Sequence, residues 1–210
     1  MKAVDALSRL QGAGPLALRT AEAMALLGAD ASSACKILSR LSDAGLIRRL
    51  KRGLWVVDRR ADPMALARFL TAPFPCYVSL QSALYTHGMI SQIPASVYVV
   101  SLARTETRRT PCGDFSIHHL APAFFFGDEA VGDQGARMAS PEKALLDFLY
   151  LGPARSRLFA ALPELELPRR FSASRARQMI RRLPAGRRRT LLERRFEQIV
   201  QGAAGGRRRE

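Results

Sequence analysis

One pair of residues has the spacing of a covalent catalyst. Ser140 and Lys143 are separated by two residues, and in serine acylases with this spacing the lysine assists attack by the serine hydroxyl. However, Ser140 precedes Pro141, which is the arrangement of a helix N-cap, and Lys143 can pair with Asp147 one turn later. The companion motifs Ser-Asp-Asn and Lys-Thr-Gly are absent from the chain. We therefore expect a structural role for this pair, no catalytic residues and no enzyme activity.

Potential metal ligands are few and poorly placed. His118 and His119 are adjacent in a predicted strand, so their side chains point to opposite faces and do not easily bind one ion together, even with Cys112 nearby. The acidic residues within 128–133 could hold a cation, although a solvated Gly-rich loop is the expected outcome. The three cysteines are widely spaced, which argues against a disulfide framework or a zinc site. We predict no metal, no cofactor and a reducing, cytoplasmic location.

Polar and cationic residues gather on one predicted helix, at about residues 31–44. Asp30 can cap this helix, and apolar residues from Ala34 to Leu41 recur at helical spacing and should face the core. The outer face then carries short or cationic side chains, which let a helix approach a major groove and donate hydrogen bonds to bases and phosphates. These predicted DNA-binding residues are Ser32, Ser33, Lys36 and Arg40.

A basic β-hairpin is predicted directly after this helix, in residues 47–57. Two apolar runs flank a tight bend that ends at Gly53. Cations at or beside its tip would neutralise phosphates or enter a minor groove. With helices predicted at about residues 1–10 and 20–27, the order is that of a winged helix-turn-helix, which we assign to residues 1–60; a small bundle with solvated cations is the alternative. The predicted DNA-binding residues of the hairpin are Arg48, Arg49, Lys51 and Arg52.

The net charge of +15 is concentrated at the two ends of the chain. Residues 1–60 hold 11 Lys and Arg against 5 Asp and Glu, whereas residues 168–210 hold 14 against 3. Such an excess indicates a polyanionic partner at one or both ends. No run of about 18 apolar residues predicts a membrane span, so no membrane partner is expected. A second basic surface is predicted on the C-terminal helices, at Arg188, Arg189, Arg194 and Arg195.

The fold class predicted for the whole chain is α+β. Strands predicted at 96–102 and 114–120 alternate with helices, which indicates a mixed α/β domain over residues 61–165. An Arg-rich helical part follows at residues 166–201, with helices expected after Ser172 or Ser174 and at residues 187–201. The Gly-, Ala- and Arg-rich residues 202–210 are expected to form a disordered tail.

Two segments of the middle part resemble a known family. Residues 77–88 read Tyr-Val-Ser-Leu-Gln-Ser-Ala-Leu-Tyr-Thr-His-Gly, and residues 139–147 read Ala-Ser-Pro-Glu-Lys-Ala-Leu-Leu-Asp. Together with Arg-Gly-Leu-Trp-Val at residues 52–56, they resemble the AbiEi family, the antitoxins and transcriptional regulators of type IV abortive-infection toxin–antitoxin systems. The resemblance covers roughly residues 15–150 and does not include the C-terminal Arg-rich helices.

The resemblance implies that a winged domain binds inverted repeats in double-stranded operator DNA and represses its own operon. It also implies that a second domain neutralises a nucleotidyltransferase-like toxin, either through direct contact or indirectly. Two other interpretations remain open from the residues alone. The chain could be a ligand-responsive winged-helix regulator unrelated to a toxin, or an enzyme that acts on nucleic acid or on the toxin.

Overall fold

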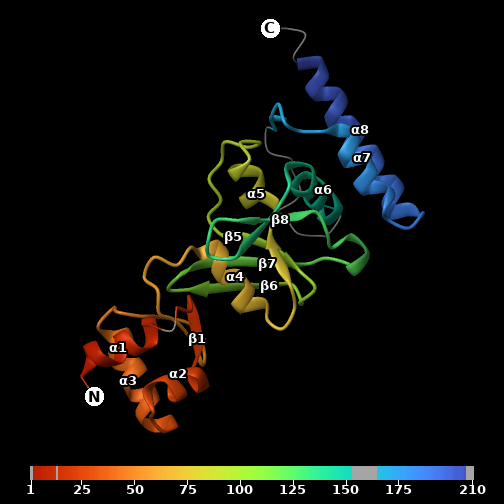
Figure 1. The fold of residues 1–210 in the computed structure, drawn as a ribbon. Coiled ribbons are helices and arrows are strands. Elements are labelled where there is room, and N and C mark those ends of the chain that lie inside the picture. The colour runs from red at the N-terminus through yellow and green to blue at the C-terminus, as the bar shows by residue number, and fades with distance from the viewer. Residues whose placement is uncertain (1, 13, 153–164, 207–210) are drawn as a thin grey trace.

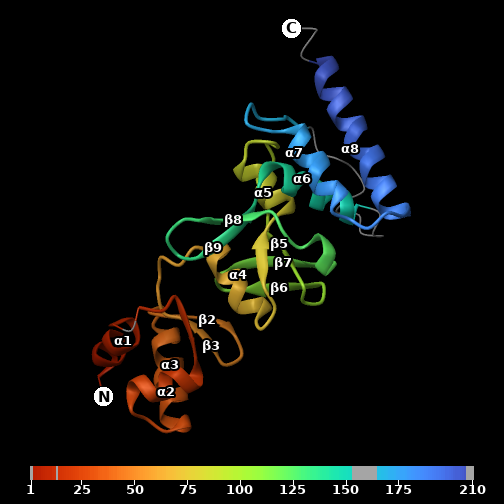
Figure 2. The same cartoon turned by 45° about the vertical axis from the view of Figure 1, so that its right-hand side comes forward.

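The computed structural model describes residues 2–12, 14–152 and 165–206, and it combines helices with two β-sheets, a mixed α+β architecture. The parts follow one another along the molecule. The N-terminal helices lie at one end, the larger sheet lies in the centre, and the last two helices lie at the other end (Figures 1 and 2). The two basic ends of the sequence are therefore also separated in space.

The N-terminal part packs three helices against a small sheet. Its strands have the order β1-β3-β2, and both pairings are antiparallel. Trp55 of this sheet lies in one core with Leu38 and Leu41 of the third helix. The first strand of the sheet was not predicted from the sequence. The elements are α1 (Ala3–Gly12), β1 (Ala17–Arg19), α2 (Thr20–Leu27), α3 (Ala31–Asp43), β2 (Arg48–Lys51) and β3 (Leu54–Val56).

Local chemistry explains where these elements begin and end. Gly28 ends α2 in the left-handed region, at φ 60°, which residues with a Cβ rarely adopt. The Asp30 carboxylate accepts a hydrogen bond from the backbone N–H of Ser33 at 3.0 Å and caps α3, as predicted. Gly53, at φ 73°, allows the two-residue turn between β2 and β3. The predicted hairpin is thus present.

The central sheet has six strands in the order β6-β7-β5-β4-β9-β8. The pairs β5–β7 and β4–β9 are parallel, and the others are antiparallel. The elements of this part are α4 (Pro63–Thr71), β4 (Cys76–Val78), α5 (Leu80–Thr86), β5 (Val97–Ser101), β6 (Glu106–Thr110), β7 (Gly113–His119), η1 (Pro122–Phe124), β8 (Asp128–Val131), β9 (Ala136–Ala139) and α6 (Pro141–Leu151).

The two faces of the central sheet belong to different cores. Val99 and Val100 are adjacent on β5 and point to opposite faces. Val100 packs with Leu84 of α5 and Leu145 of α6, whereas Val99 lies in a core shared by α4 and the N-terminal sheet. Residues 1–60 are therefore not packed separately from the rest of the chain, because their sheet shares a core with α4 and with this face of the central sheet.

The acidic segment at residues 128–133 differs from its prediction as a solvated loop. Asp128 and Glu129 begin β8, which pairs with β9 as an antiparallel hairpin. The Asp128 carboxylate forms an ion pair with Arg137 of β9, so its charge is already balanced by an arginine of the same hairpin. β8 reads Asp-Glu-Ala-Val and lies at the sheet edge; a strand of four residues without apolar alternation gives no periodic signal, and the sequence pattern therefore missed it.

The C-terminal helices α7 (Ala173–Arg181) and α8 (Arg187–Gly206) pack against α6. Ser172 caps α7 by accepting from the backbone N–H of Arg175 at 3.2 Å, as predicted. Residues 202–206, expected in a disordered tail, instead continue α8 to Gly206. The rest of the predicted tail, residues 207–210, lies outside the described residues.

Candidate nucleic-acid interface

The predicted stripe of polar residues on α3 lies on the surface. Ser32, Ser33, Lys36 and Arg40 are all exposed. The opposite side of the same helix is buried at Ala34, Leu38 and Leu41. Because residues four apart lie above one another on a helix, the serine at position 32 and the two cations form one continuous row. Such a row can follow a groove of duplex DNA.

One member of this stripe is already engaged. The Ser33 hydroxyl donates to the Asp30 carboxylate at 2.8 Å, in addition to the backbone cap. These hydrogen bonds from Ser33 hold the pKa of Asp30 below its usual value, so the carboxylate is charged at neutral pH. The hydroxyl of Ser33 is consequently less available to DNA than that of Ser32. The charge of Asp30 also lies at the N-terminus of α3, where the helix dipole would otherwise favour binding of a phosphate.

The hairpin turn lies against the start of α2. The backbone N–H of Thr20 donates to the carbonyl of Gly53 at 3.0 Å, and the Trp55 indole N–H donates to the Thr20 hydroxyl at 3.1 Å. These two bonds join β3 and its turn to the first residue of α2. The position of the basic tip is thereby fixed relative to the helix pair.

The four cations of the hairpin have different surroundings. Arg52 is exposed at the turn. Arg49 is also exposed, and its guanidinium lies over the Trp55 ring at 5.5 Å from the ring centroid, which orders the side chain. Arg48 is half-buried and donates to the carbonyl of Arg59 at 3.4 Å. The exposed pair, Arg49 and Arg52, can therefore reach DNA phosphates most directly.

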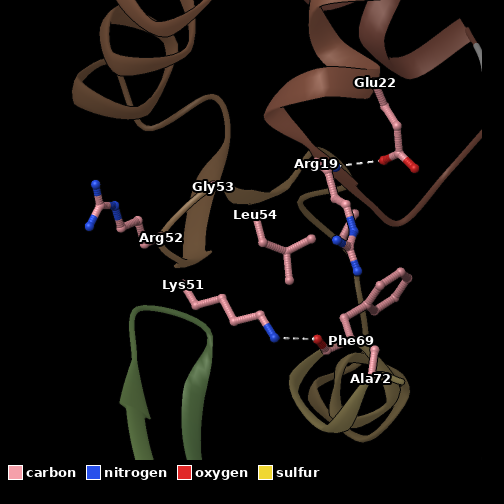
Figure 3. Close-up of a pocket in the computed structure, with 9 residues that line it drawn as sticks. Arg19, Glu22, Lys51, Arg52, Gly53, Leu54, Phe69 and Ala72 are labelled. Carbon is pink, nitrogen blue, oxygen red and sulfur yellow. Dashed lines mark hydrogen bonds between the residues drawn. The ribbon is translucent and has the colours of Figure 1, made fainter. Parts of the chain in front are cut away.

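Lys51 faces inward, away from the expected DNA side. Its Nζ atom donates to the carbonyl of Phe69 at 2.9 Å (Figure 3). It also donates to the carbonyl of Leu70 at 3.3 Å, in the same last turn of α4. Burial lowers the pKa of Lys51, and the nearby charges of Arg108 and Arg19 lower it further. In this position Lys51 neutralises the negative end of the α4 dipole, a contact that no local sequence pattern indicates.

Two cations missed by the sequence reasoning lie near Lys51. Arg19 ends β1 and precedes α2, and Arg108 lies on β6, which the sequence did not predict as a strand. Arg108 forms an ion pair with Glu106 at 2.7 Å. No signal in the sequence brings these residues to the hairpin, because the packing of β6 beside β2 is a tertiary feature.

The second predicted basic surface is mostly engaged within the fold. The Arg188 guanidinium lies over the Tyr150 ring at 4.0 Å from the centroid, and Arg189 pairs with Glu193 at 2.9 Å. Arg195 donates to the carbonyl of Leu149 at 3.4 Å. Arg188 and Arg194 are exposed, and Arg194 takes part in none of these contacts.

The motif residues of the middle part meet in a buried polar cluster. Asp147 accepts hydrogen bonds from the Tyr77 hydroxyl at 3.0 Å and the Ser79 hydroxyl at 2.7 Å, and it also pairs with Lys143. Burial and the charge of Asp147 raise the pKa of Tyr77, so its hydroxyl stays protonated and donates. This cluster, Tyr77, Ser79, Lys143 and Asp147, joins β4 to α6.

The geometry of Ser140 and Lys143 matches their predicted structural roles. The Ser140 hydroxyl accepts from the backbone N–H of Lys143 at 3.3 Å and donates to Glu142 at 3.0 Å. The Lys143 ammonium is directed at Asp147 and lies 3.9 Å from the centroid of the Phe124 ring. It therefore does not activate the serine hydroxyl.

The histidines also follow their predicted placement. His118 is buried and His119 is exposed, on opposite faces of β7. The Ser116 hydroxyl and His118 Nε2 are 2.9 Å apart. Among the described residues, no three His, Cys, Asp or Glu side chains come together as metal ligands would.

Comparisons with known proteins give no further assignment. The chain matches no protein-family model and no curated protein. None of the described helices combines the length and apolar character that a membrane span requires.

Proposed function

We propose that the chain is a DNA-binding transcriptional regulator whose residues 1–60 form a winged helix-turn-helix. The element order α1-β1-α2-α3-β2-β3 and the antiparallel β1-β3-β2 sheet support this assignment. The observation that carries the proposal is the exposed row Ser32, Lys36 and Arg40 on α3, followed by a hairpin with exposed cations. In this proposal α3 enters the major groove, and the hairpin contacts the adjacent backbone or minor groove.

We further propose that the protein is an antitoxin of the AbiEi type that represses its own operon and counteracts a nucleotidyltransferase-like toxin. Support comes from the two segments that carry the resemblance, because their residues Tyr77, Ser79, Lys143 and Asp147 converge in one cluster. This burial assigns the motif a structural role. The surface that acts on a toxin would then lie elsewhere on the middle part.

DNA binding is tested by fluorescence anisotropy with the protein's upstream promoter fragment and with random duplex of equal length. We expect the promoter fragment to bind more tightly, with a linear decrease of log affinity with log salt. Arg52→Ala should reduce that slope by about 0.9, the value for one lost phosphate contact. The matched control is Arg104→Ala, because Arg104 is an exposed cation in the loop after β5. Equal affinity for both duplexes at low salt would reject operator recognition.

The antitoxin proposal is tested by growth. Cells that express a nucleotidyltransferase-like product of a neighbouring gene should stop growing, and co-expression of this chain should restore growth. An Arg52→Ala variant should still restore growth from an unrelated promoter, because neutralisation is assigned to the middle part. Arrest that persists despite normal levels of the chain would contradict the antitoxin role and leave the DNA-binding proposal intact.

A further inference from the structure

A cavity lies where the N-terminal hairpin meets α4 (Figure 3). Its volume is about 370 Å³, which falls within the range of small-molecule sites in proteins. Three segments far apart in the sequence form its walls: the end of β1 with the start of α2, the β2–β3 turn, and the last turns of α4. The lining residues are Ala17, Arg19, Glu22, Lys51, Arg52, Gly53, Leu54, Phe69 and Ala72.

Two cations face this cavity from different walls. The Arg19 side chain extends from the end of β1 into the space between Leu54 and Phe69, and the Lys51 ammonium enters from the hairpin (Figure 3). Arg52, although it lines the cavity, points away from Leu54. Arg19 and Lys51 lie opposite Leu54 on the two strands that flank β3, so a ligand between them would contact both at once.

The nearby acids have other partners, and the charge of Glu106 offsets only part of the effect of burial and of Arg108 and Arg19 on Lys51. The Glu22 carboxylate accepts from the backbone N–H of Arg19 at 2.6 Å, and Glu106 is paired with Arg108. Among the described residues, the Arg19 guanidinium has no ion pair. Burial and the charges of Arg108 and Arg19 lower the pKa of Lys51, which means that the ammonium is held among like charges in a recess. Focused positive potential of this kind attracts an anion.

Apart from Glu22, Arg52 and Gly53, the remaining lining residues are apolar. Ala17 and Leu54 come from the N-terminal sheet, and Phe69 and Ala72 come from α4. An inorganic ion alone would leave this part of the cavity unfilled. Two cations beside apolar side chains favour a ligand with a charged group and a flat or aliphatic body. The apolar side chains bind the body, and the cations fix its orientation.

We propose that this cavity binds a small organic phosphate of about the size of a nucleoside monophosphate. Its phosphate lies between Arg19 and Lys51, and its organic part lies against Leu54 and Phe69. The Arg19 guanidinium offers the paired N–H groups that match two phosphate oxygens. Lys51 supplies a second positive charge, and it can retain its bonds to α4 because an ammonium has three donors.

Such a ligand would join the hairpin to α4. If the proposed DNA-binding function holds, ligand binding should also change the affinity for operator DNA, because Arg52 lies on the turn that lines the cavity. Binding itself does not rest on that function, and it is measured without DNA.

The test is the melting temperature of the full chain in the presence of adenosine monophosphate, inorganic phosphate or adenosine. We expect the monophosphate to raise the melting temperature with saturation below about 10 mM, a weaker effect of inorganic phosphate, and no effect of adenosine. Arg19→Ala should weaken the apparent affinity at least about tenfold. The side chain of Arg19 is exposed, so this variant should fold. Arg181→Ala, an exposed cation on α7, is the matched control and should keep the wild-type shift.

Two results would overturn the inference. One is the absence of a shift with the monophosphate up to about 10 mM, ten times the concentration that half-fills a millimolar site. The other is an equal shift in wild type and Arg19→Ala. If the Arg19→Ala variant loses duplex affinity while wild type ignores the monophosphate, the phosphate belongs to the DNA backbone. In that case the cavity proposal fails and the DNA-binding function stands.

Discussion

Lys143 and Asp147 lie one helical turn apart on α6 and form an ion pair in which neither side chain is exposed. Burial lowers the pKa of Lys143 and raises the pKa of Asp147, because each charged form loses its hydration. The attraction between the two groups opposes both shifts. The hydroxyls of Tyr77 and Ser79 and the ring of Phe124 complete the surroundings of the pair, so each charge has compensating contacts.

Removing either charge should therefore destabilise the folded protein. We expect Asp147→Asn or Lys143→Met to lower the free energy of unfolding by about 3–5 kcal/mol, since each leaves one buried charge without its partner. The double variant should lose less than the sum of the two single losses. Urea denaturation of all four proteins measures this coupling. Additive losses would show that the two groups do not stabilise each other.

Helix ends could be predicted from the sequence because capping is local. Asp30, Ser140 and Ser172 each accept the backbone hydrogen bond that their helices require. The strand β5 was also predicted because it is rich in β-branched residues, and β7 was predicted because Phe115 and Ile117 alternate after a turn. The strands β1, β4, β6, β8 and β9 were missed, since segments of three to five residues show little periodicity and their partners in the sheet define them.

In the candidate interface, too, features set by local sequence were predicted and features set by tertiary contacts were not. The α3 row followed from helical spacing, and the hairpin turn followed from Gly53. The inward position of Lys51 could not be predicted, because it depends on the last turn of α4, 18 residues away. The contacts of Tyr77 and Ser79 with Asp147 span 70 and 68 residues, and no spacing rule reaches across such distances.

The buried imidazole of His118 predicts a stability that depends on pH. Burial lowers the pKa of His118 from 6.5 to about 4, so the folded protein holds the neutral form. Between these two pKa values the unfolded chain binds more protons than the folded protein does. The free energy of unfolding therefore rises with pH across that window. Above about pH 6.5, keeping His118 neutral contributes up to about 3 kcal/mol to the free energy of unfolding. This contribution is lost as the pH falls to about 4.

The measurement compares urea denaturation of wild type and His118→Gln at several pH values. The difference between the two proteins should change across the window and be constant above it. The His119→Gln variant is the control, because His119 is exposed on the other face of β7. A pH-independent difference between wild type and His118→Gln would mean that the imidazole is not held neutral.

Lys51 and Arg52 are neighbours in sequence, but they should act on different properties. Lys51→Ala should lower the free energy of unfolding by about 1–2 kcal/mol, because the carbonyls of Phe69 and Leu70 lose a charged donor. Arg52→Ala should leave stability nearly unchanged and reduce the salt dependence of DNA binding. Urea denaturation and anisotropy titrations on the same preparations separate the two effects. The reverse assignment of effects would place Lys51, rather than Arg52, at the DNA.

Arg40 should affect which sequence is bound more than how tightly DNA is bound in general. Its exposed side chain lies in the α3 row, where an arginine can form two hydrogen bonds to a guanine. We expect Arg40→Ala to reduce promoter affinity by about 1–3 kcal/mol while random duplex changes little. Competition between promoter and random duplex measures this ratio. Equal weakening on both duplexes would show that Arg40 contacts phosphate only.

The C-terminal helices should not contribute to the protein–DNA contact that we propose for α3 and the hairpin. They lie at the opposite end of the molecule from α3 (Figure 1), and three of the arginines on α8 already contact Tyr150, Glu193 or Leu149. We therefore expect the Arg187→Ala/Arg194→Ala double variant to keep the wild-type salt slope on a short promoter duplex. Both side chains are exposed, so stability should also be retained. A slope reduced by about 1.8, the value for two lost phosphate contacts, would instead place α8 on the duplex, and the DNA would then have to contact both ends of the molecule.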